Sequence, residues 1–75
     1  MENIELKELI EKTRYNISSL ARYIERKADR EGGEKINHVT IRSWVNGISK
    51  PSIRKFKIFQ SALHELGIDI DINIF

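Results

Sequence analysis

The chain has 75 residues, of which 32% are charged and none is cysteine. A chain of this length forms one domain with a small core and is too short to enclose a deep active site in addition. The lack of cysteine excludes disulfides and thiolate metal sites. The net charge of +2 is uneven, because residues 1–13 carry −2, residues 14–57 carry +7 and residues 58–75 carry −3. A basic middle between acidic ends is typical of a surface that faces phosphate groups.

Several classes of protein are disfavoured by what the sequence lacks. No apolar run reaches membrane-spanning length, and the first residues do not resemble a secretion signal, so we expect a cytoplasmic protein. His38 and His64 belong to different predicted helices, and no acid or nucleophile is spaced to join them into a catalytic set. We expect no enzyme, no metal site, no cofactor and no small-molecule ligand.

The first two predicted helices have structural roles. Residues 4–13 form one helix with a buried side made by Leu6, Leu9 and Ile10. Asn16 is a favourable N-cap for the second helix. Its pattern continues to about residue 30, where two glycines end it. The apolar residues of this second helix are Ile17, Leu20, Ala21 and Ile24.

Residues 37–46 predict a short third helix. Asn37 is a good N-cap, Gly47 can adopt the left-handed conformation that ends a helix, and Pro51 follows. Two faces result from spacings of three and four residues. The residues expected on the buried face are Ile41, Trp44, Val45 and Ile48, and those expected on the outer face are His38, Arg42, Ser43 and Asn46.

Ser52 is a plausible N-cap for a fourth helix over residues 53–66, which Gly67 ends. Its expected core residues are Ile53, Phe56, Phe59 and Leu63. Arg54, Lys55 and Lys57 gather near its start, where bases oppose the helix dipole. They form either a solvated end or a phosphate contact.

The last segment, residues 68–75, alternates isoleucine with polar residues, which is the period of a strand. A single strand lacks a partner in this chain, so we predict that it pairs with the same segment of a second chain. Ile58 and Ala62 are expected off the core side of the fourth helix and to extend that interface. The alternatives are a truncated fifth helix or a tail laid over the core. The predicted dimer residues are Ile58, Ala62, Ile68, Ile70, Ile72 and Ile74.

Residues 36–52 resemble the recognition helix and following loop of the phage-repressor/Cro-like helix-turn-helix family. The resemblance rests on Thr40-Ile41, Trp44, Asn46-Gly47 and Lys50-Pro51-Ser52, which fall in register within one segment. It implies an all-α, lambda-repressor-like domain of four helices over residues 1–67, followed by the extended segment.

The resemblance also implies a site on duplex DNA. Position by position, base contacts would come from His38, Val39 and Ser43, with Arg42 reaching a base edge or a phosphate. Val39 either packs inside the protein or touches a thymine methyl group, and Arg42 is the best single candidate because arginine on guanine is the commonest specific contact. The phosphate contacts would come from Arg22, Arg26, Asn46, Ser49, Lys50, Ser52, Arg54 and Lys55.

The chain departs from the family in two places. Residues 25–35 are mostly an insertion, which is either a solvated extension of the second helix or an extra arm on the DNA backbone. Ile17 stands where the family commonly has a glutamine that touches a phosphate. The helix amides or Ser18 and Ser19 would have to replace that contact.

These features together predict a small transcriptional repressor or phage-type regulator that binds a pseudo-palindromic operator as a homodimer. The alternative is a protein-interaction module with the same fold, such as an antitoxin-like partner or a phage accessory factor, that uses its apolar C-terminal half. RNA binding is a weaker alternative because the chain has no aromatic platform for bases.

Overall fold

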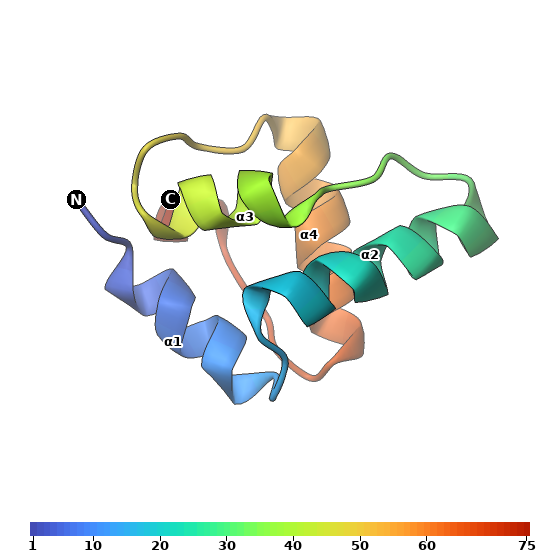
Figure 1. Cartoon of the computed structure of the whole chain (residues 1–75), viewed down its shortest axis with the longest axis horizontal. Helices are drawn as coiled ribbons and strands as arrows, with labels where there is room; N and C mark the ends of the chain where they lie inside the picture. The colour runs from blue at the N-terminus through green and yellow to red at the C-terminus, as the bar shows by residue number, and fades with distance from the viewer.

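The computed structural model describes residues 1–75 as four α-helices and one short 3-10 helix, with no strand (Figure 1). Helix α2 packs against both α3 and α4, and α1 packs against α3. The predicted all-α class with four helices is confirmed. The elements are α1 (Ile4–Lys12), α2 (Ile17–Glu31), α3 (His38–Val45), α4 (Ile53–Glu65) and η1 (Ile72–Ile74).

Each α-helix begins after a polar residue whose side chain accepts a hydrogen bond from a first-turn amide. Asn16 and Ser19 form a reciprocal capping box, in which each side chain accepts from the other's backbone N–H. The predicted caps of α2, α3 and α4 are confirmed, and the cap of α1 is an addition to the predicted set. The four capping residues are Asn3, Asn16, Asn37 and Ser52.

The core is built around Phe59, which is fully buried in α4. The Trp44 ring meets the Phe59 ring edge to face at 5.4 Å and the Phe75 ring at 5.8 Å. Such pairs contribute about 0.5 to 1.5 kcal/mol beyond the area they bury. Trp44 therefore joins α3 both to α4 and to the end of the chain.

Two residues expected in the core are on the surface instead. Ile48 is 77% exposed, because α3 ends at Val45 and the left-handed turn at Gly47 breaks the helical spacing that predicted its burial. Ile53 is 65% exposed, because it is the first residue of α4 and precedes the part of the helix that contacts the core.

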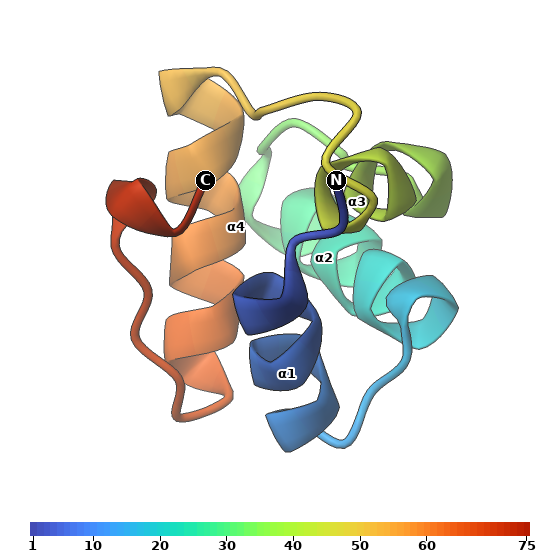
Figure 2. The same ribbon diagram turned by 90° about the vertical axis from the view of Figure 1, so that its left-hand side faces the viewer.

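The C-terminal segment forms no strand, so the predicted strand is wrong, while contact of this segment with a second chain stays a prediction. It runs beside α4 and turns back over the core (Figure 2). Gln60 Nε2 donates to the carbonyl oxygen of Ile70 at 2.8 Å, and Asn3 Nδ2 donates to that of Ile74 at 2.9 Å. The alternative of a tail over the core is confirmed, because these contacts satisfy backbone carbonyls that a strand would offer to a second chain.

The predicted apolar stripe for a dimer is also largely absent from the surface. Ala62 is fully buried, and Ile70 is buried at 7% exposure. Ala62 is buried because it lies with Phe59 and Leu63 on the side of α4 that joins the hydrophobic core, so the buried arc of this helix is wider than predicted. Ile58, Ile68 and Ile74 are half-buried against the core, and Ile72 alone is exposed, at 46%.

The tail leads to a prediction with a matched control. Replacing Ile70→Ala should lower the free energy of unfolding by about 2 to 5 kcal/mol, because it leaves a cavity in the core. Ile72→Ala should change it by about 0.5 kcal/mol or less, because that side chain is exposed. Urea unfolding at two protein concentrations measures both. Equal losses, together with a concentration-dependent midpoint, would favour an intermolecular strand over the intramolecular tail.

The N-terminal residues cover the turn that ends α3. The backbone N–H of Asn3 donates to the carbonyl oxygen of Val45 at 2.6 Å. Gly47, at φ +72°, lies against Met1 so closely that a Cβ there would overlap the Met1 carbonyl oxygen. Gly67 has a similar φ of +85° at the end of α4, but a Cβ there would meet no atom within 4 Å.

These two glycines form a second matched pair. Gly67→Ala should cost about 1 kcal/mol of unfolding free energy, the ordinary cost of a left-handed residue with a Cβ. Gly47→Ala should cost more, because it also displaces Met1 from the end of α3. Thermal unfolding of both variants measures the difference, and equal costs would show that the Met1 contact is dispensable.

Candidate nucleic-acid interface

Helix α3 is held on its inner side by three buried residues, Ile41, Trp44 and Val45. The loop before it is anchored by Ile36, which is 2% exposed, and Asn37 Oδ1 accepts from the Thr40 amide at 2.9 Å. The protein itself therefore occupies most of the inner face. The outer face of this helix is free to meet another molecule.

The outer face carries four exposed side chains in one stripe, His38, Val39, Arg42 and Asn46. Val39 is 62% exposed, so the interpretation that it packs inside the protein is wrong. Arg42 forms no ion pair and no side-chain hydrogen bond within the chain. Its five guanidinium donors are thus available to an external acceptor.

Ser43 differs from the other predicted base-contacting residues. It is half-buried, and its Oγ lies 2.7 Å from Ser49 Oγ. The Ile48 amide also donates to the Ser43 carbonyl oxygen at 2.9 Å. These bonds fasten the loop to the last turn of α3. The role of Ser43 in the folded chain is to position that loop, a role that spacing alone did not reveal.

The loop after α3 and the start of α4 form a basic surface. Residues 36–64 contain no acid. Ser52 Oγ accepts from the Lys55 amide at 3.2 Å, so this predicted phosphate contact is already engaged as a helix cap. The bases of this stretch that form no ion pair are Arg42, Lys50, Arg54, Lys55 and Lys57.

Residues 25–35, which we predicted to be mostly an insertion, have a different electrostatic character from this basic surface. Lys27 Nζ pairs with Glu31 at 2.6 Å and with Glu65 at 2.7 Å. Lys35 Nζ pairs with Asp29 at 3.3 Å and Glu25 at 3.6 Å. These contacts support the solvated-extension interpretation for both lysines, because their charges are neutralised by acids of the chain itself.

Arg22 and Arg26 lie one turn apart on the exposed face of α2, opposite the buried Leu20 and Ile24. Neither arginine forms an ion pair. They remain candidate phosphate contacts on the outer side of α2, which packs against α3.

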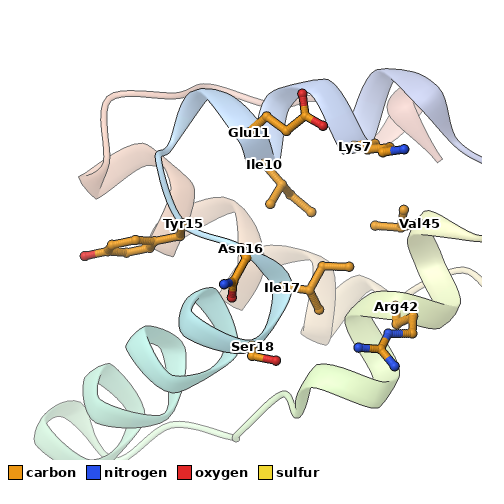
Figure 3. A pocket seen from close by; sticks show the side chains of 9 residues that line it. All are labelled: Lys7, Ile10, Glu11, Tyr15, Asn16, Ile17, Ser18, Arg42 and Val45. Carbon is orange, nitrogen blue, oxygen red and sulfur yellow. The ribbon is translucent and has the colours of Figure 1, made fainter.

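A cavity of about 390 Å³ lies where α1, the start of α2 and α3 meet (Figure 3). The side chains of Ile10, Ile17 and Val45 converge on it from these three helices. Lys7 and Arg42 also line it. In the sequence, Ile17 stood out only because the family that the chain resembles commonly has a glutamine at this position. The structure places Ile17 in the lining of this cavity.

A hydrogen-bonded group joins α2 to the end of α4 and can be tested by pH. Lys27 and the hydroxyl of Tyr23, which donates to Glu65 at 2.7 Å, hold the pKa of Glu65 below its ordinary value of 4.5. The same bond to Glu65 raises the pKa of Tyr23. A carboxyl with a lowered pKa in the folded state stabilises the protein above its unfolded pKa, and this contribution is lost as pH falls through the folded pKa.

We therefore expect Glu65→Gln to be less stable than the unmodified protein at neutral pH, with the difference shrinking below about pH 4.5. Thermal unfolding from pH 7 to pH 3 measures it. Glu8→Gln, on the exposed side of α1 and outside any ion pair, is the control. A constant difference across this range would contradict the electrostatic role of Glu65.

Comparison of the chain with protein-family models, curated proteins and solved structures finds no match in any of the three. None of the four helices has the length and apolarity needed to cross a bilayer. No three His, Cys, Asp or Glu side chains are grouped so that they could hold a metal ion.

Proposed function

We propose that this chain is a sequence-specific duplex DNA-binding protein of the helix-turn-helix type, which acts as a small transcriptional repressor. The observation that carries the proposal is the outer face of α3, where His38, Val39, Arg42 and Asn46 are exposed on a helix seated firmly from behind. A short helix of this kind fits the major groove of B-DNA, where base edges are distinguishable.

The distribution of charge supports the same function. Residues 36–64, which include α3, the loop after it and the start of α4, contain five bases without an ion-pair partner and no acid. Phosphate contacts from such a surface fix the position of a reading helix and make affinity fall with salt. In this proposal Lys50, Arg54 and Lys55 hold one strand of the backbone.

Arg42 has the central role in specificity. Its guanidinium group can donate two hydrogen bonds to the O6 and N7 atoms of guanine. Val39, one turn earlier, offers a methyl surface to thymine. His38 and Asn46 extend the stripe at its two ends, and Ser43 contributes by fixing the loop through Ser49.

Dimeric binding is part of the proposal. Two copies of the chain would read half-sites about 34 Å apart, so occupancy of DNA would respond to protein concentration. Ala62 and Ile70 are buried within one chain, which makes them less suited to the interface than the sequence suggested. The same burial weakens the support for the alternative of an interaction module that uses this apolar half.

Selection from random duplex DNA at near-physiological salt tests the function. The unmodified protein should enrich a defined sequence, and Arg42→Ala should lose that preference, since a bidentate contact to guanine discriminates by about 1 to 3 kcal/mol. An inverted repeat among the enriched sequences would support the dimer.

Lys12→Ala is the matched control, because it removes one exposed, unpaired positive charge from α1, outside the proposed interface. It should keep the same preference with little loss of affinity. If the unmodified protein enriches nothing, or if Arg42→Ala enriches the same sequence as before, the assignment of α3 as the reading helix fails.

A further inference from the structure

The cavity between α1, α2 and α3 has a size and a composition that the proposed DNA contacts do not use. Its volume of about 390 Å³ lies within the range of roughly 300 to 1,000 Å³ typical of small-molecule sites. Three apolar side chains, Ile10, Ile17 and Val45, converge on it from three different helices and together make up what we call its apolar wall. From the sequence we expected no small-molecule ligand. The sequence could not reveal this cavity, because only the fold brings these residues together.

The charged residues around the cavity favour an anion. Arg42 and Lys7 contribute two positive charges, and Glu11 contributes one negative charge. Lys7 Nζ has a partial partner in Glu2 at 3.3 Å, whereas Arg42 has none. Figure 3 shows the Glu11 carboxylate directed away from Arg42, so the guanidinium is the dominant charge beside the apolar wall.

We infer that this cavity binds a small amphipathic carboxylate, with the carboxylate on Arg42 and the hydrocarbon part against Ile10, Ile17 and Val45. A guanidinium pairs with a carboxylate through two parallel hydrogen bonds. An inorganic anion would satisfy only the charged part of this site, because it would leave the apolar wall in contact with water.

The site has a regulatory consequence that rests on the proposed function. Arg42 belongs both to the cavity and to the exposed stripe of α3, so one guanidinium would serve two ligands. Occupancy by a carboxylate would therefore weaken DNA binding, and by thermodynamic reciprocity DNA would weaken carboxylate binding. The ligand would act as an inducer that releases the repressor.

The direct test is a titration of the full chain, labelled with ¹⁵N, with hexanoate at constant ionic strength. We expect saturable shifts of the amide signals of Ile10, Ile17, Ser18 and Val45. Two comparison probes separate the parts of the ligand. Inorganic phosphate supplies charge without a hydrocarbon part, and 1-hexanol supplies the hydrocarbon part without charge, so both should bind more weakly.

Variants identify the anchoring group. Arg42→Gln should weaken hexanoate binding about tenfold or more, the loss expected for a hydrogen bond to a charged group. Arg30→Gln, which removes an exposed charge at the far end of α2, should leave it unchanged. The Arg42 side chain makes no contact that holds the fold, so we expect the variant to be folded. An unchanged dispersion of its amide signals checks this.

Each other outcome overturns the inference. A lack of saturable shifts removes the site, and equal affinity for phosphate reduces it to an anion contact without an apolar ligand. Equal affinity for 1-hexanol, or an unaffected Arg42→Gln variant, removes the assigned carboxylate contact. Hexanoate competition against the selected DNA then tests the regulation. If hexanoate binds but no DNA sequence is enriched, the carboxylate site stands and the proposed function fails. If a DNA sequence is enriched but hexanoate does not bind, the proposed function stands and the carboxylate site fails.

Discussion

The seating of Trp44 on Phe59 and Phe75 is the interaction on which the rest of the structure depends. Helix α3 has only eight residues, and a helix of this length is marginal without tertiary contacts. The two edge-to-face aromatic contacts fix its inner side to α4 and to the end of the chain. Asn3 completes the arrangement, since it caps α1 and also bonds to the carbonyl oxygens of Val45 and Ile74.

The distribution of charge follows from this arrangement. Acids and bases alternate along the second half of α2, where Lys27 and Lys35 find partners within the chain and tie α2 to α4 and to the following loop. The segment from α3 into α4 has bases alone, so its charge is left for an external anion. The proposed DNA contacts and the proposed carboxylate site both use this surplus, and they meet at Arg42.

Local sequence signals predicted the helices and their caps well, because Asn16, Asn37 and Ser52 act on amides three residues away. Signals that depend on distant partners were missed. The alternation of residues 68–75 fits a strand, but Gln60 and Asn3 supply partners for its carbonyls and the core receives Ile70. Periodicity likewise could not show that the turn at Gly47 would place Ile48 in solvent, or that three helices would leave an open cavity where they meet.

The contact between Trp44 and Phe75 also bears on the order in which the protein folds while it is being synthesised. Ribosomes deliver α2 and α3 before the tail, so at first α3 has only α2 and α1 to rest on. Phe59 reaches Trp44 when α4 emerges, and Phe75 and the carbonyl of Ile74 arrive later. A nascent chain that has exposed α4 but not the tail therefore has the outer face of α3 without its complete support. Firm seating of that helix therefore waits until the tail has been made.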